Sequence, residues 1–340
     1  ILSILFLEIL LKIYSDFNKV FIINDNKNSK LLKVYDEGII FKNYGNFFKY
    51  NENLKDIRYI NFFYDKDNLV KVWDYKFSTN NYGLVQNKNI YEDNESILFL
   101  GDSFTEGQGS EPWLNLFDGS FKEFQIINGG FQGTGFQQFE NFEKYISNQI
   151  KINHVVVLYI GGDLRRGIVN IKNSKCIKNF ENCSSGNSHF GLPKNSSFNI
   201  EKNILKLLDD RKKTKFKTKI KYFIRDTYIY SYSRTVINTF RLRNNKTINR
   251  NLDAINNLKN KYKDNIYFIR INTAEEIAMN KVSYEAKVIK KFLKKNNIKS
   301  YFCNMNNNIK FFHKYDYHPN KKGYKNLYNC VTRILDNLVY

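Results

Sequence analysis

The sequence contains little cysteine, no internal repeat and none of the common metal or nucleic-acid motifs. Its four Cys among 340 residues form no C-x-x-C pair, which argues against a zinc site. The net charge of +21 comes mostly from scattered Lys, and no zinc-finger, basic-zipper or RNA-binding aromatic signature accompanies it. The lack of repeats excludes a fibre or a solenoid. We therefore expect no metal and no nucleic-acid partner.

Apolar and aromatic residues are abundant enough to form a folded core. Hydrophobic residues make up 42% of the chain and aromatic residues 16%, which excludes a disordered polymer. A chain of 340 residues predicts one large α/β domain with an appendage, or two medium domains. The basic charge is also compatible with acidic glycans or anionic lipid headgroups as partners.

The first residues form an apolar run. Residues 1–14 are almost wholly apolar, and the sequence does not begin with Met. The run is shorter than the roughly 20 residues that cross a bilayer as a helix. A buried core helix and a signal-peptide core are alternatives, although no small-residue cleavage site follows. We expect residues 1–16 to be the trailing part of a membrane anchor, with the rest of the chain facing the periplasm or the cell exterior.

The four cysteines fall into two pairs by location. Cys176 and Cys183 bracket a short polar loop, whereas Cys303 ends an expected strand and Cys330 lies on the expected C-terminal helix. An even count in an exported protein favours disulfides, so we predict Cys176–Cys183 and Cys303–Cys330 bridges. Four reduced and unrelated thiols are the alternative.

Residues 17–95 favour a small β-rich appendage. This region consists of short aromatic and β-branched runs separated by Asn, Asp, Gly and Lys turns. The expected strands are Val20 to Ile23, Ile39 to Tyr44, Tyr59 to Tyr64 and Leu69 to Phe77.

From Ser96 onward, apolar strands alternate with longer helical stretches, a pattern typical of a parallel sheet with helices on both faces. The expected strands are Ile97 to Leu100, Phe124 to Ile127, His154 to Ile160, Ile266 to Ile271 and Lys299 to Cys303. The expected helices are Gln137 to Gln149, Asn199 to Asp209, Leu252 to Tyr262, Ser283 to Asn296 and Pro319 to Leu338. Residues at about 168–250 interrupt this alternation, and we expect them to form a lid-like insertion.

A serine follows the first of these strands directly. Residues 97–100 lead into Gly101-Asp102-Ser103, where the chain turns toward a helix. Open α/β folds bind their ligands at this carboxyl edge of the sheet. The triplet alone carries little information, and its position after a buried strand gives it weight.

An Asp/His pair precedes the last helix. Asp316 and His318 lie in the loop before the helix that Pro319 is expected to begin. A serine hydroxyl becomes a good nucleophile when an imidazole takes its proton and a carboxylate orients that imidazole. Ser103, His318 and Asp316 supply these three parts. In the alternative, His318 merely caps or packs against the helix.

Two glycine-rich segments follow the next two strands. Residues 128–135 contain Gly133, and residues 161–167 contain Gly162. Glycine lets backbone N–H groups approach a substrate closely, so either segment could supply donors to an oxyanion. For either segment taken alone, a tight strand-to-helix turn is the better explanation.

Together these four segments resemble the SGNH/GDSL hydrolase family over residues 96–340. The resemblance implies a three-layer α/β sandwich with a mainly parallel, flavodoxin-like sheet, and no cofactor. It implies Ser103 as the nucleophile, Gly133 as an oxyanion donor beside the Ser103 N–H, and Asp316 and His318 as the other triad members. In the third segment the family has an Asn as a further oxyanion donor, whereas this chain has Gly162. Arg165 and Arg166 stand nearby and could bind an anionic substrate group, or could form surface ion pairs.

The flanking sequence points to a subgroup. The D-x-H spacing of Asp316 and His318, the apolar N-terminus and residues 77–84 are similar to membrane-anchored bacterial SGNH-like proteins of cell-surface polysaccharide loci. The resemblance predicts an esterase that cleaves acyl esters, O-acetyl esters above all, on a cell-surface or lipid-linked glycan. Two alternatives remain open: an O-acyltransferase that uses the same triad to acylate a polysaccharide, and a catalytically weakened glycan-binding protein.

Overall fold

The computed structural model describes residues 2–18, 30–35, 40–65, 68–121, 123–170, 189–191, 246–305 and 308–339, with a few residues between 202 and 233. Most of the expected lid-like insertion, the expected helix Asn199 to Asp209 and the expected strand Val20 to Ile23 lie outside these residues.

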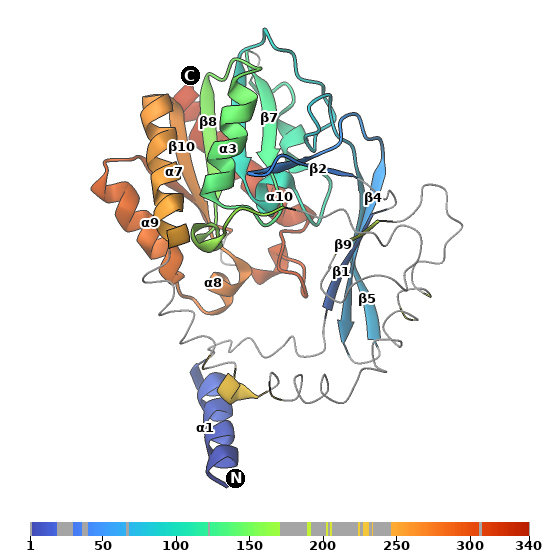
Figure 1. Cartoon of the computed structure of the whole chain (residues 1–340), viewed down its shortest axis with the longest axis vertical. Helices are drawn as coiled ribbons and strands as arrows, with labels where there is room; N and C mark the ends of the chain where they lie inside the picture. Colours follow the sequence, from blue (N-terminus) through green and yellow to red (C-terminus); the bar gives the residue numbers. More distant parts are fainter. Residues whose placement is uncertain are drawn as a thin grey trace.

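A five-stranded parallel sheet lies between helices in the larger part of the molecule (Figure 1). Its strands are β6 (Ser96–Gly101), β7 (Gln125–Gly130), β8 (His154–Tyr159), β10 (Ile266–Ile271) and β11 (Ser300–Cys303). They lie in the order β7-β6-β8-β10-β11 and every neighbouring pair is parallel. Numbered along the chain, this is the 2-1-3-4-5 order of flavodoxin-like folds, so the predicted fold class is confirmed.

Helices cover both faces of this sheet, which makes three layers (Figure 1). One face carries α3 (Phe136–Ser147), α7 (Lys246–Tyr262) and α9 (Tyr284–Lys295), and the other carries α10 (Lys321–Val339) and the 3-10 helix η1 (Trp113–Phe117). Side chains of a strand alternate between the faces, so Leu98 joins the first core and Phe99 the second. Further short helices are α2 (Ser103–Glu106), η2 (Gly161–Arg165), η5 (Lys263–Asn265), α8 (Ala274–Ala278) and η6 (Ile309–Phe311).

The β-rich N-terminal region forms a second, mostly antiparallel sheet. It contains β1 (Lys30–Tyr35), β4 (Ile57–Asp65), β5 (Asn68–Phe77) and β9 (His189–Gly191) in the order β5-β4-β1-β9, beside a hairpin of β2 (Phe41–Asn43) and β3 (Phe48–Tyr50). Strand β9 belongs to the expected insertion, yet it pairs parallel with β1. One core cluster contains Tyr35 and Tyr59 of this sheet together with Phe142 of α3. The N-terminal sheet therefore shares a hydrophobic core with the larger domain.

Several expected boundaries differ from the observed ones. The helix expected from Leu252 already begins at Lys246, and the helix expected from Pro319 begins at Lys321. Asn320 caps that last helix, since its Oδ1 accepts hydrogen bonds from the N–H groups of Lys322 at 3.0 Å and Gly323 at 3.1 Å. Strand β1 was not among the expected strands, because its sequence mixes Lys with apolar residues and lacks a period-2 alternation.

The apolar N-terminus forms helix α1, Leu2–Asn18 (Figure 1). Within the described part of the chain, no helix is both long and apolar enough to cross a membrane. The predicted membrane contact of residues 1–16 is therefore not shown.

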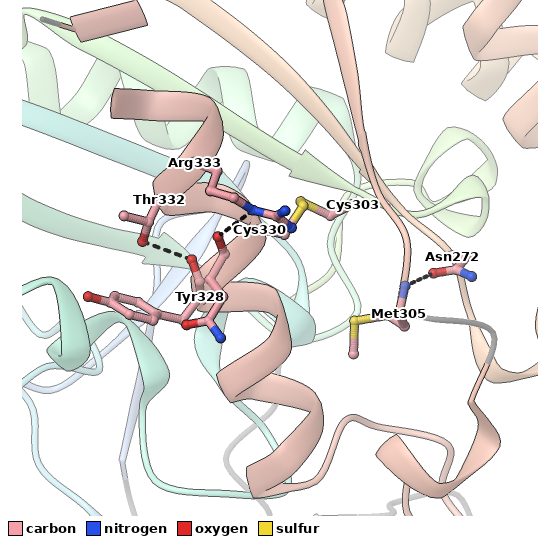
Figure 2. Close-up of a disulfide and its surroundings, with 8 residues drawn as sticks. Asn272, Cys303, Met305, Tyr328, Cys330, Thr332 and Arg333 are labelled. Carbon is pink, nitrogen blue, oxygen red and sulfur yellow. Dashed lines mark hydrogen bonds between the residues drawn. A yellow bond between two sulfur atoms is a disulfide. The ribbon is translucent and has the colours of Figure 1, made fainter. Parts of the chain in front are cut away.

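A disulfide joins β11 to α10 (Figure 2). It links Cys303 and Cys330, whose Cα atoms are 5.8 Å apart, and it confirms that predicted bridge. Cys303 ends the edge strand of the sheet, so the bridge fastens that strand to the last helix. The predicted Cys176–Cys183 bridge lies outside the described residues.

Replacing both Cys303 and Cys330 by Ala should lower the free energy of unfolding by about 2–4 kcal/mol. The reason is that the bridge, between residues 27 positions apart, restricts the unfolded chain. Denaturant unfolding without reductant measures the difference, and Cys330→Ala alone should lose a similar amount. A double variant as stable as the wild type would contradict this role.

Candidate active site

Ser103 lies at the carboxyl end of β6, as the first residue of α2. Asp102 caps this helix, because its Oδ1 accepts a hydrogen bond from the Phe104 N–H at 2.9 Å. Gly101 makes the turn possible, since a Cβ there would overlap Thr105 Oγ1 and the Leu158 carbonyl. The chain adds β7 on one side of β6 and then β8 on the other side, so the strand order reverses between β6 and β8. Ser103 follows β6, at this switch point.

Asp316 and His318 come from the loop before α10. A bridge between Phe312 and Pro319 closes this loop, and the His313 N–H donates to the His318 carbonyl at 2.9 Å. Tyr317, between the two candidate residues, has a φ of 58°, in the left-handed region that a bulky residue seldom adopts. This backbone conformation, held by the closed loop, directs the side chains of Asp316 and His318 toward each other.

The structure brings Ser103, His318 and Asp316 into one hydrogen-bonded chain. His318 Nε2 lies 2.8 Å from Ser103 Oγ, and His318 Nδ1 lies 2.8 Å from Asp316 Oδ2. A carboxylate accepts, so Nδ1–H donates to Asp316 and Nε2 is left to accept the Ser103 proton. The side chains of His318 and Asp316 are 14% and 5% exposed, so little water competes for these bonds.

The N-terminal sheet also contacts this chain. Asn61 of β4 donates from Nδ2 to Asp316 Oδ2 at 3.1 Å. The ring of Trp73, on β5, meets the His318 ring edge-to-face with centroids 5.4 Å apart, and Phe104 approaches His318 at 5.5 Å. Sequence patterns gave no sign of these contacts, because a polar or aromatic residue within a strand does not indicate which distant loop it meets.

Gly133 lies in the loop after β7 with a φ of 73°, a conformation that favours glycine. Glu106 fastens this loop to α2, because its Oε2 accepts a hydrogen bond from the Gln132 N–H at 2.7 Å. The Glu106 side chain also accepts from Tyr50 Oη at 2.6 Å, and burial raises the pKa of its carboxyl group. The loop of Gly133 is therefore held against the helix that carries Ser103.

Lys33 is a further charged residue of this region that the sequence did not reveal. It projects from β1, and its Nζ donates to Gln108 Oε1 at 2.8 Å and to Gln132 Oε1 at 3.4 Å. Burial lowers the pKa of Lys33, while the carboxylates of Asp316 and Glu106 act in the opposite direction. A cation of the N-terminal sheet thus lies within electrostatic range of the Asp316 carboxylate.

Gly162 is part of η2, the turn after β8. Its φ lies outside the left-handed region, and a Cβ there would meet only Ile160 Cδ1 at 3.8 Å and Arg166 Nη2 at 3.9 Å. Asn251 of α7 holds this turn by donating from Nδ2 to the carbonyls of Leu164 at 2.8 Å and Arg166 at 2.9 Å. The backbone at position 162 can therefore carry a side chain.

The two arginines of the same turn form ion pairs within the protein. Arg166 Nη1 lies 2.6 Å from Asp102 Oδ2 and 2.5 Å from Asp163 Oδ1, and these two carboxylates raise the pKa of Arg166. Arg165 is 59% exposed and lies 3.4 Å from Glu285. These contacts are all to the protein itself. The predicted substrate-binding role of Arg165 and Arg166 stays a prediction.

No metal cluster is evident among the residues that the structure describes, since no three His, Cys, Asp or Glu side chains are grouped suitably.

The chemistry that the arrangement allows is nucleophilic attack by Ser103 with His318 as the base.

Comparisons with known proteins found similarity at the level of solved structures. A lipase/acylhydrolase from Enterococcus faecalis is 14% identical over 72% of this chain and 96% of that chain, with a TM-score of 0.37. A member of the lipolytic protein G-D-S-L family from Veillonella parvula is 11% identical over 72% and 100%, with a TM-score of 0.34. A family 3 carbohydrate esterase from Clostridium thermocellum is 13% identical over 72% and 98%, with a TM-score of 0.38. No family model and no curated protein matches the sequence.

Arg166→Met should lower the free energy of unfolding by about 3–5 kcal/mol. The substitution keeps an apolar stem but leaves the Asp102 and Asp163 side chains, 1% and 0% exposed, without their cation. Thermal and denaturant unfolding measure the loss. Arg165→Met is the matched control and should cost less than Arg166→Met, because Arg165 is 59% exposed and its one carboxylate partner, Glu285, lies 3.4 Å away. Equal effects of the two substitutions would contradict the structural role of Arg166.

Proposed function

We propose that this chain is a serine esterase of SGNH type that cleaves O-acyl esters, acetyl esters above all, on a cell-surface or lipid-linked glycan. The observation that carries the proposal is the continuous chain from Ser103 Oγ through His318 to Asp316, with both hydrogen bonds at 2.8 Å. This geometry supports Ser103 as the nucleophile, His318 as the base and Asp316 as the orienting carboxylate.

In the first half-reaction Ser103 Oγ attacks the acyl carbonyl carbon while its proton passes to His318 Nε2. Asp316 stabilises the imidazolium that forms. The carbonyl oxygen becomes an oxyanion, which the backbone N–H groups of Ser103 and Gly133 stabilise. The Ser103 N–H has no carbonyl partner within α2, because it belongs to the first turn of that helix. The tetrahedral intermediate then expels the sugar oxygen, which takes the proton from His318 and leaves an acyl-serine.

In the second half-reaction water attacks the acyl-serine, and His318 again takes the proton. Collapse returns the proton to Ser103 Oγ and releases the carboxylic acid. An acyltransferase differs only here, because a sugar hydroxyl replaces the water. Assaying product with and without a sugar acceptor therefore distinguishes hydrolysis from transfer.

The site lacks the family's Asn donor, since Gly162 stands in its place. Losing one oxyanion donor typically lowers kcat by about 10²–10³. We propose that the Gly162 backbone N–H takes part of that role, and that the enzyme works with weaker oxyanion stabilisation than its relatives.

The glycan and the exported location are the finer parts of the proposal. The sequence similarity of residues 77–84 and of the D-x-H pair to proteins of polysaccharide loci supports the glycan. The Cys303–Cys330 disulfide supports an oxidising compartment, such as the periplasm or the cell exterior. The proposal places residues 1–16 at the membrane.

A fluorophosphonate probe should label the wild-type protein at Ser103 and should fail to label Ser103→Ala. His318→Ala should slow labelling by at least about 10³, because the hydroxyl then lacks its base. Gel fluorescence with mass spectrometry of the labelled peptide measures both. Asn320→Ala removes the cap of α10 and the hydrogen bond from Asn320 Nδ2 to the Lys310 carbonyl, but no contact of Ser103, His318 or Asp316. It is the control for folding and should still be labelled. Absence of labelling in correctly folded wild-type protein would overturn the enzyme proposal in favour of glycan binding without turnover.

Gly162→Asn should leave the rate of ester cleavage unchanged or raise it by up to about 10²–10³, because it restores the third donor. The backbone permits the change, as the φ of Gly162 is not left-handed and a Cβ has room. Hydrolysis of an activated acetate ester measures the rate, with Gly162→Ala as the control that adds a Cβ without an amide. A lower rate in the Asn variant than in the Ala variant would contradict an oxyanion role for this position.

A further inference from the structure

We propose that Asn61, on strand β4 of the N-terminal sheet, is a positioning residue of the catalytic triad. Its side-chain N–H holds the Asp316 carboxylate in the orientation that directs His318 toward Ser103. The inference rests on the proposed function, since it concerns the same hydrogen-bonded chain. It makes the N-terminal sheet part of the catalytic apparatus.

The hydrogen-bond geometry is the first support. Asn61 Nδ2 lies 3.1 Å from Asp316 Oδ2, and the same oxygen lies 2.8 Å from His318 Nδ1. Two donors therefore converge on one carboxylate oxygen from opposite parts of the chain. This arrangement restricts rotation of the Asp316 carboxylate, which His318 alone would leave less constrained.

The amide orientation follows from the chemistry of the partner. If the side-chain amide of Asn61 were flipped, its carbonyl oxygen would face a carboxylate oxygen, and neither atom can donate a hydrogen bond. The N–H must therefore face Asp316. In this orientation Asn61 Oδ1 is buried without a hydrogen-bond partner among the described residues.

Among the described residues, the side chain of Asn61 makes its hydrogen bond to the Asp316 carboxylate and leaves its oxygen unpartnered. Asn61 is 0% exposed, and a buried carbonyl without a partner destabilises the folded state. An apolar residue of similar shape would remove that cost. A buried polar residue whose hydrogen bond goes to a group next to the reacting atoms is typical of a functional requirement.

The supporting strands place Asn61 and Trp73 together. The two residues are opposite each other in the β4–β5 pair, directly before a register shift between Asn61 and Phe62. Such irregularities redirect side chains at the edges of functional sites. This residue pair thus contacts Asp316 through Asn61 and His318 through Trp73.

The first test is Asn61→Leu, which keeps the branched shape and removes both polar atoms. The rate of fluorophosphonate labelling at Ser103 should fall about 10- to 100-fold, because the base is no longer held in place. The melting temperature should change little, because the variant loses the unpartnered oxygen together with one hydrogen bond to Asp316. A labelling rate within twofold of the wild type would overturn the proposal.

Ile60→Ala is the matched control. Ile60 is 3% exposed and is the preceding residue of β4, so its side chain points to the opposite face of the sheet. This variant should lower the melting temperature yet keep a near wild-type labelling rate. If it lost labelling as Asn61→Leu does, the sheet would act through its stability alone, and the positioning role would be wrong.

The second test is the pH dependence of labelling in Asn61→Asp, which also serves if the Leu variant fails to fold. A carboxyl group at position 61 shares a proton with Asp316 at low pH, because two buried carboxylates this close repel each other, and the protonated group then donates to Asp316 as the Asn61 amide does. When the pH rises and the pair loses this proton, the donor is lost. The labelling rate of the variant relative to the wild type should therefore fall as the pH rises from about 6 to about 10. A ratio that does not fall over this range would overturn the proposal.

The other charged and titratable groups around Asp316 and His318 are the same in both proteins, so the comparison isolates position 61. They are Lys33 of β1, Tyr75 of β5, Asp102 and Glu106 at α2, Arg166 after η2, His313 of the last loop and Tyr324 of α10. If the wild type itself is never labelled, the proposed function fails and this proposal fails with it. If the wild type is labelled and both Asn61 variants match it, only the positioning role fails.

Discussion

The hydrogen bond between His318 Nε2 and Ser103 Oγ joins residues 215 positions apart, and it depends on the parallel order of the central sheet. In a parallel sheet every strand ends at the same edge, so loops from distant parts of the chain meet there. Ser103 leaves β6 at this edge. The Cys303–Cys330 bridge fastens the last strand to α10, the helix that follows the loop of His318.

Buried charged side chains around the site form ion pairs and hydrogen bonds with residues from several elements. Arg166 stands between the carboxylates of Asp102 and Asp163, so the turn after β8 is fixed to the turn that carries Ser103. Glu106 fixes the Gly133 loop to the same helix through the Gln132 N–H. Because these groups are buried, each contact is electrostatically stronger than it would be in water. They hold three loops in one arrangement.

The N-terminal sheet contributes to this arrangement as well as to the core. Asn61 and Trp73 reach the Asp/His pair, and Lys33 lies beside the Gly133 loop. Tyr35 and Tyr59 stack at 4.4 Å within the core that also contains α3. Because the sheet is packed against the larger domain, its side chains can hold those of Asp316 and His318 with fixed geometry.

The sequence by itself determined the five parallel strands, the Gly101-Asp102-Ser103 turn and the Asp316/His318 loop, because each is marked by local periodicity or by residues at an element's end. The Cys303–Cys330 bridge was also predicted from the positions of the two cysteines in the sequence. Only the tertiary structure decided that Asn61 meets Asp316, 255 positions away, that Lys33 lies beside Gln108 and Gln132, and that Arg166 is bound by two carboxylates. The physical reason is that a polar residue within a strand or turn looks alike whether it faces water or a buried partner. Its partner is fixed by how two sheets pack, which local sequence does not encode.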